Sequence, residues 1–161
     1  MAGRTATRPS GHTTEEIASA LVSVARAMTQ VRVHETLCRQ AGVDVDRLGA
    51  AVLFKLVSEG GEVRVTELAY RLAIDAPAVT RKVQQLERAG LVRRQGDPAD
   101  ARASLLDVTA AGRRTIERLQ RAQAEWMGER LAGWSAADRA ELARLLQQLA
   151  ATIAVPAEGR P

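Results

Sequence analysis

The sequence predicts a mainly α-helical fold that carries one small β-hairpin. Three observations lead to this prediction. Apolar residues recur at helical spacing through most of the 161-residue chain, aromatic residues make up only 2% of it, and one short β-prone stretch follows a glycine stop near the middle. A core made of Leu, Val, Ala and Ile suits helices that pack on helices.

Length, charge and cysteine content narrow the classes to which the chain can belong. A chain of 161 residues makes one domain with a real core. The net charge of +4 permits nucleic-acid binding without arguing for it. Cys38 is the single cysteine, so no internal disulfide can form, in agreement with a reducing compartment. Since no apolar run approaches the roughly 18 residues that span a bilayer, and no signal peptide follows Met1, we expect a cytoplasmic protein without a membrane partner.

The N-terminal part predicts a tail and one long helix. Residues 1–12 lack apolar periodicity and are expected to be unstructured. Thr13 and Glu16 have the spacing of a capping box, and the helix is expected to reach about Gln40 before a stop at Gly42. Its narrow apolar stripe is formed by Ile17, Leu21, Val24, Met28 and Val31. Such a stripe favours a second helix alongside, from another chain; the alternative is an ordinary core helix.

Two shorter helices are expected next. Asp46 can cap the first, which ends at Gly60-Gly61, and residues 62–65 form a β-prone connector. Thr66 is placed to cap the second. The inward positions are Leu48, Val52, Leu53, Leu56 and Val57 in the first helix and Leu68, Ala69 and Leu72 in the second.

The helix after these carries the side chains that matter most for function. Residues 74–76 form the turn before it, Asp75 can cap it, and Pro77 is tolerated in its first turn because a proline there loses no helical hydrogen bond. Its buried stripe is formed by Val79, Val83 and Leu86. The residues left on its outward face are Pro77, Ala78, Thr80, Arg81, Gln84, Gln85 and Arg88.

A β-hairpin is expected in residues 91–108. Leu106 and Val108 share one face of its second strand, and the polar segment before them is too long for a tight turn. Arg102 stands at the tip, where Asp100 could pair with it and fix its aim. A short helix, a turn, a second helix and a hairpin with an arginine at its tip make a winged helix-turn-helix.

The outward residues of the second helix of this motif suit a DNA major groove. Arginine pairs with guanine, glutamine with adenine, and alanine or proline contacts the thymine methyl group. Thr80 and the helix N-terminus can hold phosphates. Arg102 could enter a minor groove, while Arg93 and Arg94 could line the base of the wing toward the DNA backbone. The alternatives are a solvated helix face and a surface ion pair of Asp100 with Arg102, worth at most about 1 kcal/mol.

Two long helices are expected to follow the hairpin. Thr109 can cap one that runs to about Leu131, and Ser135 with Asp138 resembles a capping box for the last. Their apolar stripes are Ile116, Leu119, Trp126 and Leu131 in the first and Leu142, Leu145, Leu146, Leu149 and Ile153 in the second. Stripes of this kind are not left in water.

These elements predict one domain, residues 13–154, and a C-terminal tail at 155–161. Residues 46–108 form the winged helix-turn-helix. The long helices in 13–42 and 109–154 are expected to pack on their copies in a second subunit, which would bury their stripes and double the DNA-reading unit.

The central stretch resembles the MarR family of bacterial transcription regulators. The similarity is carried by VTELAYRLAIDAPAVTRKVQQLERAGLVRR, by the wing GDPADARA and by LLDVTAAGRR, and the order of helices extends it over about residues 13–153. Its most specific part is Asp100-Ala101-Arg102, followed by a Val-Thr-x-x-Gly step at 108–112. The family often has a basic residue where this chain has Ala101.

The resemblance implies roles for particular residues. Arg102 would enter the minor groove with support from Asp100, and base recognition would fall to Pro77, Ala78, Thr80, Arg81, Gln84 and Gln85. It also implies a homodimer joined through the first and last two helices, with a ligand pocket between the dimerisation and DNA-binding parts.

His34 and Cys38 are the pair that most suggests another chemistry. They lie at i and i+4, where they could hold a metal or form a nucleophile–base pair. No third ligand has convincing spacing, and no phosphate-binding glycine loop, nucleophile elbow or paired-carboxylate motif is present in the sequence. We therefore expect neither an enzyme nor a metal or cofactor site.

The predicted function is that of a dimeric transcription regulator, a ligand-responsive repressor, which binds a pseudo-palindromic operator in double-stranded DNA. A small-molecule effector is a further expected partner, of open chemical class. Two alternatives remain. One is a winged-helix protein-interaction module without a DNA role. The other is an oxidant sensor that uses Cys38, although in regulators of this kind the sensing thiol lies nearer the start of the first helix.

Overall fold

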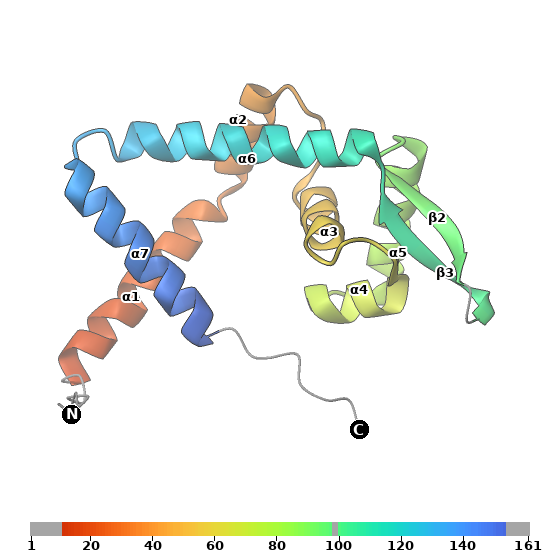
Figure 1. Cartoon of the computed structure of the whole chain (residues 1–161), viewed down its shortest axis with the longest axis horizontal. Coiled ribbons are helices and arrows are strands. Elements are labelled where there is room, and N and C mark those ends of the chain that lie inside the picture. The colour runs from red at the N-terminus through yellow and green to blue at the C-terminus, as the bar shows by residue number, and fades with distance from the viewer. Residues whose placement is uncertain (1–10, 98–99, 154–161) are drawn as a thin grey trace, which may run out of the picture. The chain divides into compact units, whose positions relative to one another are not determined.

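The computed structural model describes residues 11–97 and 100–153, and the side chains of 100–103 lie outside that description. The helices are α1 (Gly11–Met28), α2 (Val31–Ala41), α3 (Arg47–Ser58), α4 (Val65–Leu72), α5 (Ala76–Arg88), α6 (Ala110–Arg130) and α7 (Ala136–Ile153) (Figure 1). The strands are β1 (Val63–Arg64), β2 (Val92–Asp97) and β3 (Asp100–Val108). The chain divides into two compact units, Met1–Ala122 and Gln123–Pro161. Residues 1–10 of the tail expected at 1–12, and the whole tail expected at 155–161, lie outside the described residues.

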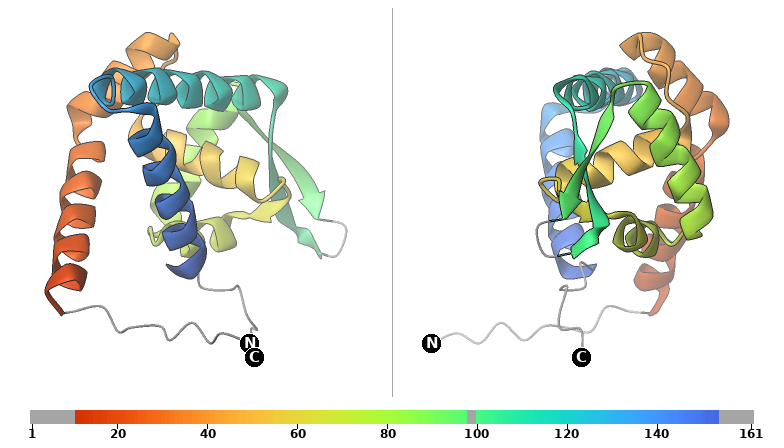
Figure 2. Two further views of the ribbon diagram at one scale, coloured as in Figure 1. Left: turned by 60° about the vertical axis from the view of Figure 1, so that its left-hand side comes forward. Right: turned by 90° about the vertical axis from the view of Figure 1, so that its right-hand side faces the viewer.

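The predicted mainly helical fold with a small sheet is confirmed, but the sheet has three strands instead of two. Its order is β1-β3-β2, with Val63 opposite Leu106 and Val92 opposite Val108 in antiparallel pairs. All four of these side chains are buried, so the β-prone connector joins the sheet because Val63 adds to the core. Figure 2 shows β2 and β3 as a ribbon beside the helices, and contacts join α3 to β3 and α5 to β2.

The apolar patterns of α3, α4 and α5 bring these helices together. Their predicted inward residues form one buried cluster, which includes Val52, Leu53, Leu56, Leu68, Ala69, Val79, Val83 and Leu86. Between α4 and α5 the chain turns at Ala73, whose φ of 53° lies in the left-handed region. Glu59, the C-cap of α3, binds Arg71 of α4 and Lys55. These two cations lower the pKa of Glu59 to about 2 and link the helix-turn-helix to α3.

Most of the predicted helix caps are confirmed. The side chain of Asp46 accepts a hydrogen bond from the Gly49 N–H at 2.8 Å, and Asp75 accepts one from the Ala78 N–H at 2.8 Å. The Ser135 hydroxyl accepts from the Asp138 N–H at 3.1 Å. Each bond satisfies a backbone donor that has no partner within its helix.

Two predicted helix starts are wrong. Thr66 does not cap α4, because β1 runs directly into the helix and Arg64 is the N-cap residue. The first helix begins at Gly11 rather than Thr13, so residues 11 and 12 are not part of an unstructured tail. The His12 Nε2 lies 3.3 Å from the Glu16 Oε1 one turn further along, and this contact supports the additional first turn.

The single long helix predicted from Thr13 to about Gln40 is also wrong, since it is broken into α1 and α2 at Thr29 and Gln30. The Thr29 hydroxyl donates to the carbonyl oxygens of Ala25 at 2.8 Å and Arg26 at 3.2 Å. Gln30 is extended, with φ −62° and ψ 137°. Threonine competes in this way with the helical ladder, and the apolar spacing continues across the break, which is why periodicity alone did not reveal it.

The start of α6 is fastened to the end of α5 through the Val-Thr-x-x-Gly step. The Thr109 hydroxyl donates to the Gly90 carbonyl oxygen at 2.7 Å and accepts from the Gly112 N–H at 3.1 Å. The Thr109 N–H donates to the Leu91 carbonyl oxygen at 3.0 Å. A Cβ on Gly112 would lie 2.2 Å from that same oxygen. Glycine at this position is therefore required by close packing.

Replacing Gly112 tests this junction. Gly112→Ala is expected to lower the free energy of unfolding by about 1–3 kcal/mol, because the added methyl group meets backbone that cannot move away. Gly128→Ala, in the same helix, is the matched control, since nothing lies within 4 Å of its added Cβ. The control is expected to be neutral or to stabilise by up to about 1 kcal/mol. Equal melting temperatures of the two variants would contradict this account.

Candidate nucleic-acid interface

The outward face predicted for α5 is largely exposed. Pro77, Arg81, Gln84, Gln85 and Arg88 are exposed, while Ala78 and Thr80 are half-buried. The Thr80 hydroxyl donates to the Ala76 carbonyl oxygen of its own helix at 2.8 Å, so its hydrogen is not directed at a phosphate. The Arg88 Nε donates to the Gln84 carbonyl oxygen at 3.2 Å. Among the described residues Arg81 has no ion-pair partner, which leaves its guanidinium available to a ligand.

Lys82 joins this face and binds Asp46. The sequence pattern predicts Asp46 only as a helix cap and indicates no role for Lys82. The Lys82 Nζ lies 2.5 Å from Asp46 Oδ2 and 2.5 Å from Gln85 Oε1. The Lys82 side chain is only 15% exposed. Desolvation acts to raise the pKa of Asp46, but hydrogen bonds from Lys82 and the Gly49 N–H and the positive charge of Lys82 outweigh it and lower that pKa. The Lys82–Gln85 spacing was visible in the sequence, whereas nothing in it paired Lys82 with a residue 36 positions away.

The base of the wing is held by ion pairs. Arg94 Nε lies 3.0 Å from both carboxylate oxygens of Glu87 on α5. Arg93 donates to Asp107 Oδ2 at 2.5 and 2.9 Å, and Arg64 of β1 binds Asp97 of β2. The two wing arginines expected to face the DNA backbone therefore already have carboxylate partners.

The tip of the wing is described only in part. β3 begins at Asp100, which pairs with Asp97 after an irregularity at Gly96 and Asp97. Asp100 and Arg102 thus belong to a strand, and the predicted contact between their side chains lies outside the described residues.

Two helices present apolar side chains to solvent. In α1, Ile17 and Val24 are 48% and 58% exposed, and in α7, Leu145 and Ile153 are 48% and 66% exposed. These are members of the apolar stripes predicted from the sequence. In contrast, Ile116, Leu119 and Trp126 of α6 are buried. Contiguous exposed apolar side chains are uncommon on the surface of a monomeric protein.

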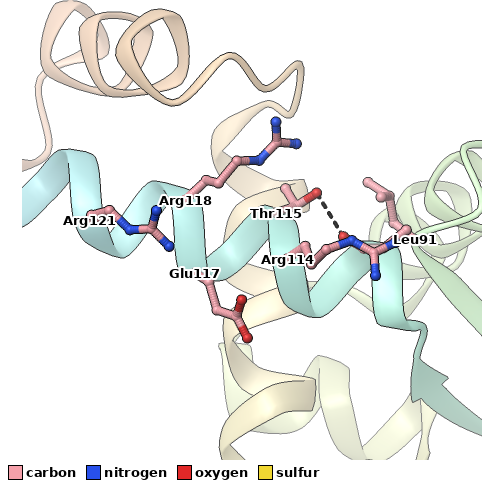
Figure 3. A pocket seen from close by; sticks show the side chains of 7 residues that line it. Leu91, Arg114, Thr115, Glu117, Arg118 and Arg121 are labelled. Carbon is pink, nitrogen blue, oxygen red and sulfur yellow. Dashed lines mark hydrogen bonds between the residues drawn. The ribbon is translucent and has the colours of Figure 1, made fainter.

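A cavity of about 540 Å³ lies along the first half of α6. Figure 3 shows the arginines Arg114, Arg118 and Arg121 projecting from the helix around it, with Leu91 at one end. The Arg118 Nη1 donates weakly to the Gly42 carbonyl oxygen, at 3.4 Å. For Arg114 and Arg121 the described residues provide no ion-pair partner. Glu117 also lines the cavity, so three arginines and one carboxylate leave it with an excess of positive charge beside the apolar end.

His34 and Cys38 do lie together, in a structural arrangement. The His34 Nε2 lies 2.8 Å from the Val45 carbonyl oxygen, and the Cys38 thiol donates to that oxygen at 3.3 Å. Burial raises the pKa of the Cys38 thiol, so the reactive thiolate is disfavoured. Within the described ranges no group of three or more potential metal ligands gathers, and none of the helices described is both long and apolar enough to cross a membrane.

Known proteins match the chain over the winged part and beyond it. The sequence profile of the MarR family matches residues 50–104. The chain is 35% identical over 97 residues to the uncharacterized HTH-type transcriptional regulator YdgJ of Bacillus subtilis, covering 60% of this chain and 59% of that protein. It is 32% identical over 110 residues to the uncharacterized HTH-type transcriptional regulator ML2140 of Mycobacterium leprae, covering 68% of this chain and 73% of that one. The first match thus spans less than two thirds of its relative.

Solved structures match over most of the chain. A MarR family protein from Bacillus stearothermophilus superposes with a TM-score of 0.76 at 22% identity, covering 92% of this chain and all (100%) of that one. The PcaV transcriptional regulator from Streptomyces coelicolor, solved in complex with its natural ligand, gives a TM-score of 0.52 at 28% identity over 93% and 96% of the two chains. With the exposed face of α5, the three-stranded wing and these similarities in agreement, the chain belongs to the MarR family of helix-turn-helix transcriptional regulators.

Proposed function

We propose that this chain represses transcription as a dimer that binds a pseudo-palindromic operator. The observation that carries the proposal is the division of α5 into two faces. Val79, Val83 and Leu86 are buried in the core, which turns Arg81 and Gln84 outward on the opposite side. A helix anchored along one side, with cations and amides along the other, fits the major groove.

The wing supplies the second contact of this proposal. Arg102 would enter a minor groove beside the recognition helix, and Asp100 would support it. Ion pairs of Arg93 with Asp107 and Arg94 with Glu87 stiffen the base of the ribbon. They favour a wing that keeps a fixed direction relative to α5 when DNA binds.

Replacing Arg102 tests DNA binding by the wing. Arg102→Ala is expected to weaken binding to DNA from upstream of the chain's own gene by about 1–3 kcal/mol, with the fold retained. The exposed Arg39→Ala on α2 is the matched control, and it is expected to bind as the parent does. Fluorescence anisotropy at several salt concentrations is the measurement, because phosphate neutralisation makes affinity fall as salt rises. Binding by Arg102→Ala equal to that of the parent, or affinity independent of salt, would refute the assignment.

The dimer rests on the exposed stripes of α1 and α7. A second copy could bury the exposed Ile, Leu and Val side chains of α1 and the exposed Leu and Ile side chains of α7. Dimerisation would set two copies of α5 about one helical turn of DNA, ~34 Å, apart. Sedimentation of the free protein at twice the chain mass is the check, and a monomer at micromolar concentration would exclude it.

We also propose a small organic anion as the effector. The three arginines of the α6 cavity supply charge and hydrogen-bond donors for a carboxylate or phosphate, and the apolar end at Leu91 suits the rest of such a molecule. A volume of about 540 Å³ is ample for one. Binding would lower DNA affinity by favouring one of two dimer states. The PcaV structure, solved with its natural ligand, shows that a protein of this fold can bind a ligand.

A panel of aromatic and aliphatic carboxylates and phosphates, with their neutral amides, tests the cavity. At least one anion is expected to release DNA from the parent, and the corresponding amide is not. The double variant Arg114→Ala/Arg121→Ala should respond about tenfold more weakly, because it loses two of the three arginines that outweigh Glu117 in the cavity. Arg139→Ala, outside the cavity, is the control and should respond as the parent does. Release that is equally strong in the double variant would place the effector elsewhere.

A further inference from the structure

The amide of Gln85 is held in one orientation by its own helix. The Lys82 Nζ lies 2.5 Å from Gln85 Oε1, one turn along α5. An ammonium group only donates hydrogen bonds, so the atom that faces it must be the amide oxygen. The amide nitrogen therefore points to the other side of the group. Among the described residues that nitrogen has no partner, and the Gln85 side chain is exposed.

Asp46 holds the Lys82 ammonium group, which in turn orients the Gln85 amide. Its Oδ2 lies 2.5 Å from the Lys82 Nζ, while its Oδ1 caps α3 through the Gly49 N–H. The Lys82 side chain is 15% exposed, so the ammonium has little freedom to leave. The chain Asp46–Lys82–Gln85 thus runs from a helix terminus to the DNA-reading face.

This arrangement changes what Gln85 can recognise. Glutamine reads adenine by accepting from the exocyclic N6 amine and donating to N7. Here the oxygen is already bound by a cation, and that positive charge disfavours a further donor group beside it. The two N–H groups remain, and guanine offers two acceptors, O6 and N7, in the major groove.

We propose that Gln85 acts as a hydrogen-bond donor that selects guanine, and that Lys82 and Asp46 are positioning residues for this selection. The inference rests on the proposed function, since it assigns a base preference to the same DNA-reading face. It differs from the sequence-based expectation that glutamine pairs with adenine, because the Lys82–Gln85 contact within α5 occupies the amide oxygen. Asp46, at the start of α3, holds Lys82 in that position.

Selection of bound sequences from a randomised operator library tests the proposal. The full-length parent is expected to enrich guanine at one position of each half-site, by about tenfold over adenine. Gln85→Ala identifies the position, because preference there should disappear while the other positions keep theirs. Lys82→Met frees the amide oxygen and keeps an apolar stem in its place. It should reduce the guanine-to-adenine ratio at that position about tenfold.

Two further variants separate positioning from folding. Asp46→Asn keeps a good helix cap but removes the charge that holds Lys82, so it should relax the preference in the same direction without lowering the melting temperature. Lys55→Met removes the other lysine, which pairs with Glu59 at 2.9 Å, and should leave the preference unchanged.

The outcomes distinguish this inference from the function on which it rests. A parent that selects adenine at the Gln85-dependent position, or a Lys82→Met variant with the parent's ratio, overturns the inference and leaves DNA binding intact. If Gln85→Ala changes the base preference at no position, the inference is likewise overturned and DNA binding is left intact. A parent that shows no salt-sensitive DNA binding overturns both.

Discussion

The reading of DNA by this protein depends on the burial of three side chains of α5. Val79 and Val83 are fully buried and Leu86 is 5% exposed, so the helix cannot roll about its axis without exposing apolar surface to water. Two further contacts hold it in place. Lys82 binds Asp46 at the start of α3, and the residues after α5 are fastened to α6 through Thr109 and Gly112. The direction of the outward face follows from these restraints.

The charges of the winged part serve two purposes. Lys82, Arg94, Arg93 and Arg64 are held by Asp46, Glu87, Asp107 and Asp97, so these cations shape the interface more than they supply free charge to it. Arg81 remains available on α5, and Arg102 lies in the strand that follows the wing tip. This division explains why a modest net charge of +4 is compatible with a DNA-binding surface: a few placed cations matter more than the total.

Much of the fold could be predicted from local pattern. The stripe of α5, the caps Asp46 and Asp75 and the fold class follow from spacing and residue type. The break at Thr29 was missed because the apolar spacing continues through it, and β1 was missed as a strand because two residues give no periodicity. The ion pairs of Lys82 with Asp46 and of Arg93 with Asp107 join residues 36 and 14 positions apart, and only the folded chain brings them together. A glutamine considered without its neighbours therefore predicts pairing with adenine. The Lys82 contact occupies the amide oxygen of Gln85 and leaves its N–H groups to donate to a base.

The most direct test of this account is a hydroxyl-radical footprint of the protein on DNA from upstream of its own gene. Two recognition helices about one turn of DNA apart should protect two symmetric half-sites, centred ~10 base pairs from each other. Protection should extend into the flanking minor grooves, where the wings would lie. A single unsymmetric protected segment, or no protection at a salt concentration that permits nonspecific binding, would contradict the claim that this chain is half of a paired DNA reader.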